Sequence, residues 1–271
     1  MIGVFDSGFG GLTILRALRR RLPQYDYLFL GDNARAPYGT RSMEMVYRFT
    51  LEAVQYLFAQ GCPLVILACN TASAKALRTI QQRDLPVSDD PTRRVLGVIR
   101  PTVEAIGSLT STGHVGVFGT PGTISSESYN LEIAHLYGGQ YTVTGHPCPM
   151  WVPLVENRES DGDGADYFVR KDIDALLSRD PMIDTVILGC THYPLLINKI
   201  TRYLPQQVRA IEQGPIVADS LADYLKRHPE TDSRLTRTGT CRYLTTDTID
   251  KFSELATVFT GEDVVATKIV L

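Results

Sequence analysis

Two cysteines occupy matching places in the sequence, and their surroundings point to chemistry. The run Val65-Ile66-Leu67-Ala68-Cys69-Asn70-Thr71 aligns with Val186-Ile187-Leu188-Gly189-Cys190-Thr191-His192. In each run an apolar strand and a small residue precede the cysteine, and polar residues that can start a helix follow it. Ligands bind at the carboxyl ends of strands in open α/β sheets, and a cysteine near a helix N-terminus tends to be reactive. We therefore interpret Cys69 and Cys190 as a functional pair, one in each of two similar halves.

Three kinds of chemistry could use two such thiols. A structural zinc site needs four ligands, usually in Cys-x-x-Cys pairs, and the sequence has no such pair, so no metal site is predicted. A redox dithiol usually has the same close spacing. General acid–base catalysis needs one thiolate and one thiol on opposite faces of a substrate. That arrangement suits inversion at a carbon centre, because one cysteine removes a proton while the other supplies one from behind.

The other cysteines and most histidines have no comparable setting. We interpret Cys62, Cys148 and Cys241 as small buried hydrophobic residues. Trp151 is expected in the core or at an interface. The histidines expected to be structural or exposed are His114, His135, His146 and His228.

Composition places the chain among soluble globular proteins. It has 271 residues, of which 44% are hydrophobic and 21% charged, and its net charge is −3. These values exclude a disordered chain, a fibrous repeat and a small disulfide scaffold, and they give no electrostatic reason to expect nucleic acid or an anionic membrane as partner. The five cysteines cannot all pair in a monomer, and the N-terminus lacks the pattern of a signal peptide. The sequence therefore predicts free thiols in the cytoplasm, with apolar runs too short to span a bilayer.

Short apolar strands alternate with amphipathic helices, which is typical of an α/β protein with parallel sheets. Leucines at helical spacing predict a helix that stops near Pro23, and Ser42 is the expected N-cap of a helix that ends at Gly61. Residues 84–94 and 157–164 are expected to be surface loops, and Asp161-Gly162-Asp163-Gly164 lacks the further ligands of a calcium loop. The expected strands are residues 2–5, 27–30, 64–68, 95–99, 115–118, 141–144, 185–188 and 208–211.

Cofactor-binding motifs are missing from the sequence. The glycines after the first strand do not complete Gly-x-Gly-x-x-Gly, because Thr13 stands at the final position. No glycine loop is followed by Gly-Lys-Ser/Thr, and no lysine is singled out as a pyridoxal Schiff base. The expected chemistry is therefore free of cofactors.

Four segments, in order and spread over nearly the whole chain, carry a family resemblance. They are Ile2–Leu12 (IGVFDSGFGGL), Gly31–Gly39 (GDNARAPYG), Ala68–Ser73 (ACNTAS) and Leu188–Leu195 (LGCTHYPL). Together they resemble the bacterial glutamate racemases. The first two segments favour that family over the related aspartate racemases, hydantoin racemases and maleate isomerases.

The resemblance implies a cofactor-independent two-base racemase that acts on glutamate and supplies D-glutamate for peptidoglycan. Cys69 would be the base for the D-enantiomer and Cys190 the base for the L-enantiomer. Asp6 would assist Cys69, while Glu156 and His192 would support Cys190. The positions that match the family's substrate-binding residues are Asp6, Ser7, Pro37, Tyr38, Gly39, Cys69, Asn70, Thr71, Cys190, Thr191 and His192, with Thr120 and Thr123 as additional contacts.

Simpler roles stay open for three of these residues. Asp6 could cap the helix after the first strand, and His192 could cap a helix that begins near Tyr193. Glu156 could be a surface residue. An anionic Asp6 would raise the pKa of a nearby thiol rather than lower it, so its expected role is proton handling or orientation.

The resemblance also implies two similar α/β domains with mostly parallel sheets and an active site in the cleft between them. The first domain would comprise residues 1–97 and 210–271, and the second residues 98–209. A homodimer is expected. One departure is the segment Ile211-Glu212-Gln213-Gly214-Pro215, which stands where many relatives have an Asp-Ser-Gly-like turn. We expect Gly214 to preserve that turn.

Two rival functions remain at this point. One is the conversion of a different acid, such as aspartate or maleate. The other is a catalytically silent protein that binds an amino acid on the same scaffold.

Overall fold

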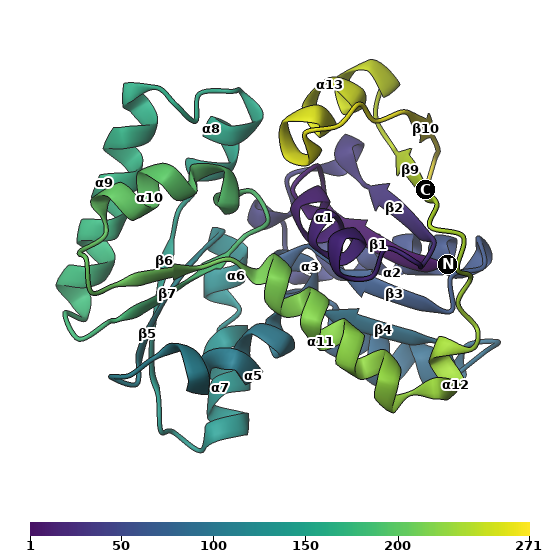
Figure 1. Cartoon of the computed structure of the whole chain (residues 1–271), viewed down its shortest axis with the longest axis horizontal. Helices are drawn as coiled ribbons and strands as arrows, with labels where there is room; N and C mark the ends of the chain where they lie inside the picture. Colours follow the sequence, from purple (N-terminus) through teal and green to yellow (C-terminus); the bar gives the residue numbers. More distant parts are fainter.

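Two parallel β-sheets form the framework of the molecule, as Figure 1 shows. A computed structural model describes residues 1–271. The six-stranded sheet has the order β10-β9-β2-β1-β3-β4 and the four-stranded sheet the order β6-β5-β7-β8, and every pairing is parallel. The strands are β1 (Ile2–Asp6), β2 (Tyr27–Gly31), β3 (Leu64–Leu67), β4 (Arg94–Gly97), β5 (His114–Gly119), β6 (Thr142–Pro147), β7 (Thr185–Gly189), β8 (Arg209–Ile211), β9 (Cys241–Thr245) and β10 (Ala266–Lys268).

Helices cover both faces of each sheet. The longer helices are α1 (Gly11–Arg21), α2 (Met43–Ala59), α5 (Ile99–Leu109), α7 (Ser128–Tyr137), α9 (Asp163–Arg179), α11 (Gln213–Arg227) and α13 (Ile249–Thr260). The shorter helices are α3 (Asn70–Lys75), α4 (Leu77–Thr79), α6 (Pro121–Ser125), α8 (Trp151–Glu156), α10 (Ile197–Tyr203) and α12 (Pro229–Asp232). Single turns of other helix types lie at Asn33–Arg35, Tyr38–Thr40, Ile80–Asp84, Leu85–Val87 and Tyr193–Leu196.

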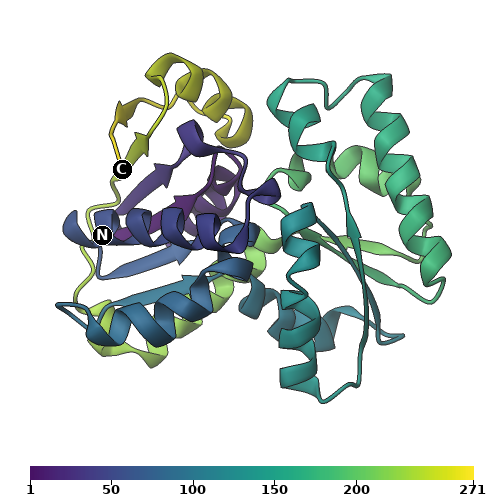
Figure 2. The same ribbon diagram turned by 180° about the vertical axis from the view of Figure 1, so that it is seen from behind.

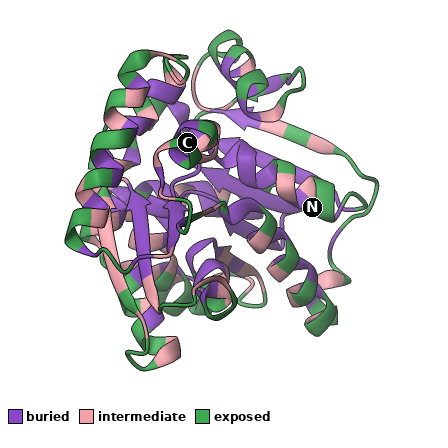
Figure 3. Cartoon of the chain, turned by 60° about the vertical axis from the view of Figure 1, so that its left-hand side comes forward, coloured by how far each residue is buried: buried purple, intermediate pink, exposed green.

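Alternating side chains of the buried strands build separate cores on the two faces of each sheet. In β1, Ile2 and Val4 pack with α1, α11 and α13, whereas Phe5 faces α2 and α3. Seen from behind, α2 lies across the face of the first sheet opposite α1 (Figure 2). The second sheet packs α5 and α7 on one face and α8, α9 and α10 on the other. The strands β1, β2, β3 and β7 are buried along their whole length, as expected for central strands of parallel sheets, and Figure 3 shows buried strands inside the molecule.

The predicted helix ends at Ser42 and Gly61 are confirmed. The Ser42 hydroxyl accepts a hydrogen bond from the Met45 N–H at 3.2 Å, which satisfies one of the free donors at the start of α2. Gly61 has a φ of +82°, a conformation that favours glycine after a helix. Trp151 is fully buried, also as predicted.

Three sequence predictions about secondary structure are wrong in detail. The strand predicted at 95–99 ends at Gly97, because Ile99 begins α5 and continues the apolar run on a buried helix face. The loop predicted at 157–164 is shorter, since α9 begins at Asp163. The turn expected at 211–215 is the start of α11, where a Cβ on Gly214 would lie 3.1 Å from Ala17 Cβ of α1. Gly214 therefore serves close helix packing rather than a turn.

The chain crosses between the sheets at two places. The first sheet draws its strands from residues 2–97 and 241–268, and the second from residues 114–211. β8 pairs with β7 up to Ile211, and α11 then returns to pack on α1. The division into domains at 97/98 and 209/210 stays a prediction. No helix has the length and apolar character needed to cross a bilayer.

Candidate active site

The two cysteines of the sequence pair lie directly beyond the carboxyl ends of equivalent central strands. Cys69 follows β3 after one residue, and Cys190 follows β7 at once. Asp6 is the last residue of β1, and Thr120 comes directly after β5. Both cysteines are buried, with 5% and 7% of their surfaces exposed. The structure therefore gathers the predicted chemistry at the strand ends, where α/β proteins bind ligands.

Some groups around Cys69 raise the pKa of its thiol and others lower it. Its Sγ lies 3.3 Å from Ser7 Oγ and accepts a hydrogen bond from the Ala72 N–H at 3.4 Å. Burial and the nearby Asp6 carboxylate raise the pKa of Cys69 to about 12, although the two hydrogen bonds act against that shift. Cys69 is consequently a protonated thiol at neutral pH.

Asp6 connects the Cys69 side of the site to the Cys190 side. Its Oδ2 accepts the Gly8 N–H at 2.9 Å, and its Oδ1 accepts the Thr191 hydroxyl at 3.5 Å. Burial raises the pKa of Asp6, while His192 and the main-chain N–H groups of Gly8 and Gly11 oppose the rise. The N-cap of α1 is Gly10, with no side-chain hydrogen bond. Asp6 thus bonds within the turn but is not the helix cap.

His192 lies between Cys190 and Glu156 and contacts both. His192 Nδ1 lies 3.9 Å from Cys190 Sγ, and its Nε2 lies 2.9 Å from Glu156 Oε1. Burial disfavours the imidazolium, but Cys190 and Glu156 outweigh it and raise the pKa of His192 to about 10. His192 makes no capping bond to the following turn. The histidine is therefore a cation at neutral pH, and its Nδ1 faces the Cys190 sulfur.

Three threonine hydroxyls lie together, one from the first turn of α3 after Cys69 and two from the start of α6 after β5. Thr71 Oγ1 lies 2.9 Å from Thr120 Oγ1 and 3.2 Å from Thr123 Oγ1, and the last two are 3.1 Å apart. Gly39 belongs to the same surface, because a Cβ at that position would lie 2.8 Å from Thr120 Cβ. Only glycine lets this loop approach so closely.

Pro37 and Tyr38, which precede Gly39 in the same loop, do not approach the threonine cluster in this way. The Tyr38 hydroxyl donates to Asp32 at 2.5 Å, and its ring packs near Phe5 and Phe49. Pro37 is exposed. The Tyr38 side chain therefore stabilises the loop from the core, and its hydroxyl is already engaged.

Sequence reasoning missed several buried polar residues near the site. Asn33 has a buried amide nitrogen without a hydrogen-bond partner, while its Oδ1 accepts the Thr245 hydroxyl at 3.0 Å. Asn33 lies inside Gly31–Gly39, one of the four segments that carry the family resemblance, and that position could have marked it as a site residue. Gln213, Tyr129 and Thr102 join Asn70 in a buried network, and no local pattern marks them.

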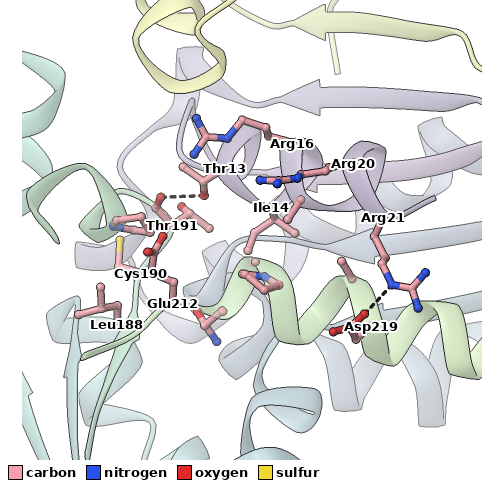
Figure 4. A pocket seen from close by; sticks show the side chains of 16 residues that line it. Thr13, Ile14, Arg16, Arg20, Arg21, Leu188, Cys190, Thr191, Glu212 and Asp219 are labelled. Carbon is pink, nitrogen blue, oxygen red and sulfur yellow. Dashed lines mark hydrogen bonds and ion pairs between the residues drawn. The ribbon is translucent and has the colours of Figure 1, made fainter. Parts of the chain in front are cut away.

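A cavity of about 460 Å³ reaches Cys190 from the side of α1 and α11 (Figure 4). Across its inner end the Thr13 hydroxyl donates to the Thr191 carbonyl at 3.0 Å. The lining includes Cys190 and Thr191 but no residue of the Cys69 cluster. This cavity therefore lies beside Cys190 and does not extend to Cys69.

One group of side chains has the composition of a metal site. Donor atoms of His146, Cys148 and Asp172 lie within 4.8 Å of one another, and zinc takes such ligands. His146 Nε2 already bonds Asp172 Oδ1 at 3.1 Å, and Cys148 is 1% exposed. Two of the three donors thus bond each other, and the structural roles of His146 and Cys148 stay predictions.

Comparisons with known proteins show the family of the chain. The family model described as Asp/Glu/Hydantoin racemase matches residues 12–221. The chain belongs to the Asp/Glu/hydantoin racemase family. Within that family, it is 40% identical over 273 residues to the glutamate racemase of Ruegeria sp. strain TM1040, covering 97% of each chain. It is 45% identical over 241 residues to the glutamate racemase of Dinoroseobacter shibae, covering 84% of this chain and 85% of the relative.

Solved structures of the family extend the likeness to three dimensions. The Bacillus anthracis glutamate racemase isoform RacE1 has a TM-score of 0.88 and 34% identity, covering 100% of this chain and 97% of its own. The Francisella tularensis glutamate racemase, solved in complex with D-glutamate, has a TM-score of 0.86 and 31% identity with the same coverage. These comparisons confirm the predicted family and the predicted α/β fold.

Proposed function

We propose that the chain racemises glutamate by a two-base mechanism in which Cys69 and Cys190 act on opposite faces of the α-carbon. One observation carries the proposal, namely that two thiols at equivalent strand ends have different partners. Cys69 lies beside Ser7 and Asp6, whereas Cys190 lies beside His192 and its Glu156. Acid–base inversion requires one sulfur that gives a proton and another that takes one, and two thiols with different partners suit that division of roles.

In the direction from L- to D-glutamate, Cys190 takes the α-proton and Cys69 gives one to the other face. The Cα–H bond breaks as a proton moves to Cys190 Sγ, and the Cys69 S–H bond supplies the proton that forms the new Cα–H bond. The His192 imidazolium lies 3.9 Å from Cys190 Sγ, and the raised pKa of Cys69 keeps its proton available. The reverse direction exchanges the two roles. Asp6, whose own pKa is raised, is placed to handle the proton that Cys69 must then lose.

Neutral hydrogen-bond donors near each cysteine, in the sequence or in the fold, suit an amino-acid dicarboxylate. These donors follow strands of both sheets. They are the hydroxyls of Ser7, Thr191 and the threonine cluster, and the amide of Asn70. Fixed donors of this kind orient the substrate so that each face meets one sulfur. The same positions are those assigned to substrate by resemblance.

Three further proposals follow from the family. The D-glutamate product would supply peptidoglycan synthesis, and the protein would act in the cytoplasm as a homodimer. Light scattering after size exclusion, at several protein concentrations, should give twice the chain mass. A mass equal to one chain at all concentrations would contradict the dimer.

Substrate choice is tested by following optical rotation with L-glutamate and L-aspartate separately, using freshly reduced protein. We expect rotation to decay to zero with L-glutamate and to change far more slowly with L-aspartate. Loss of rotation with aspartate alone would overturn the glutamate assignment. Binding of glutamate without any racemisation would instead support a catalytically silent protein.

Glu156→Gln is expected to shift the alkaline limb of the pH profile to lower pH. His192 has a pKa of about 10 in the folded protein, so the imidazolium is present below that pH and lost above it. The Glu156 carboxylate lies 2.9 Å from His192 and stabilises the imidazolium. Without it the pKa of His192 should fall, and the alkaline limb of kcat/KM should move to lower pH by about one unit. The matched control is Glu230→Gln, because Glu230 pairs with His228 at 3.0 Å on the surface. An unshifted limb in Glu156→Gln would contradict the assigned role of His192.

A further inference from the structure

A closed ring of hydrogen bonds joins three fully buried side chains next to Cys69. Asn70 Nδ2 donates to Gln213 Oε1 at 2.6 Å, Gln213 Nε2 donates to the Tyr129 hydroxyl at 2.8 Å, and that hydroxyl donates to Asn70 Oδ1 at 2.7 Å. Each side chain is 2% exposed. Because each member donates once and accepts once, the ring has a single direction.

Thr102 determines that direction. The Thr102 hydroxyl has one hydrogen, which it donates to the Val98 carbonyl at 2.8 Å. Towards Gln213 it can therefore only accept, which it does from Nε2 at 2.9 Å. A flipped Gln213 amide would place its oxygen against that acceptor. The nitrogen of Gln213 must face Thr102, so its oxygen must face Asn70.

The ring members come from separate parts of the fold. Asn70 begins α3 immediately after Cys69, Tyr129 belongs to α7 beside the second sheet, and Gln213 begins α11 where the chain leaves β8. The crossing from the second sheet back to the first is thus bonded directly to the residue beside Cys69. In Figure 1, α11 is the helix that runs from the second sheet beneath α1.

We infer that Gln213 and Tyr129 are positioning residues that fix the amide of Asn70 toward the substrate, an inference that rests on the proposed function and deepens it. A terminal amide torsion is otherwise broad and nearly twofold. The ring uses the oxygen and one N–H of Asn70. The amide plane is then fixed, and the second N–H stays free to donate to the substrate. In a buried setting such bonds are strong and their loss is costly.

Tyr129→Phe is expected to raise KM for both enantiomers of glutamate by about tenfold, with a smaller change in kcat. The substitution removes one oxygen and with it two of the three ring bonds, so the Asn70 amide loses its fixed direction. A merely structural role would lower the thermal midpoint and the active fraction and leave KM unchanged. Tyr27→Phe is the matched control, because Tyr27 is equally buried and its hydroxyl bonds only the Leu18 and Leu22 carbonyls.

A double-mutant cycle decides whether the two residues act through Asn70. Asn70→Ala alone should raise KM, and adding Tyr129→Phe to it should raise KM no further. Gln213→Met, which has similar volume and cannot form the ring, should give the same non-additivity if Tyr129→Phe folds poorly. Independent, additive effects on KM in both cycles would overturn the inference.

The same assays separate this inference from the function on which it rests. If the unsubstituted protein does not racemise glutamate, the proposed function fails and the inference fails with it. If the unsubstituted protein is active and the cycles are additive, only the positioning role fails.

Discussion

Cys69→Ser and Cys190→Ser are each expected to lower kcat/KM for glutamate by about 10³-fold or more, in both directions. A serine hydroxyl is a far weaker acid than a thiol, so it cannot act as the base at either face. Each direction needs one sulfur to remove a proton and the other to supply one. Since the enantiomers are equal in free energy, kcat/KM must fall equally for L- and D-glutamate.

Stability controls separate chemistry from folding in these variants. The change from sulfur to oxygen is small, so far-UV circular dichroism and the thermal midpoint should stay close to those of the parent. Cys62→Ser is the matched control, because Cys62 is also buried but lies in the core beneath α2. It should keep its activity within a few-fold. A Cys69→Ser variant with full activity would contradict the two-base mechanism.

Gly10→Ala is expected to lower kcat/KM by about 10²-fold while the protein stays folded. A Cβ at this position would lie 2.2 Å from Thr191 Oγ1 and 2.4 Å from His192 Nδ1. Neither neighbour can simply swing aside, because His192 bonds Glu156 at 2.9 Å and Thr191 bonds Asp6. The methyl group must therefore displace the segment that carries Cys190.

The same turn supplies the control for this substitution. A Cβ on Gly8 would have Glu156 Oε1 as its nearest neighbour, at 3.7 Å, which is an ordinary contact. Gly8→Ala should keep activity within a few-fold. Steady-state kinetics and thermal melts of both variants check the prediction, and equal activity of Gly8→Ala and Gly10→Ala would show that the close approach has no catalytic importance.

The sequence alone was enough for much of the fold and for the centre of the site. Buried parallel strands read as continuous apolar runs, so most central strands could be found within one or two residues. The repeated pattern around Cys69 and Cys190 predicted that both lie at strand ends. In each case an apolar run, a small residue and a polar segment that can start a helix stand next to one another in the sequence, so the prediction needed only local information. The cap at Ser42 has the same local origin.

Features that depend on contacts between distant segments could not be predicted. β10 is the edge strand of the first sheet and β9 lies next to it, and both are partly exposed and carry polar residues, so no apolar run marks them. The break between β4 and α5 lies inside one apolar run, where hydrophobicity does not distinguish strand from helix. The ring of Asn70, Tyr129 and Gln213 joins residues that are up to 143 positions apart, and only the folded chain shows that Gln213 is buried.

The two-base mechanism is tested most directly by racemising L-glutamate in deuterated water and stopping the reaction early. Deuterium at the α-carbon is then measured by mass spectrometry in each separated enantiomer. Because thiol protons exchange rapidly with solvent, Cys69 should deliver deuterium, so the newly formed D-glutamate should carry it while the remaining L-glutamate keeps its α-proton. Retention of the original proton in D-glutamate, or equal early deuteration of both enantiomers, would show that a single base serves both faces and would contradict the mechanism.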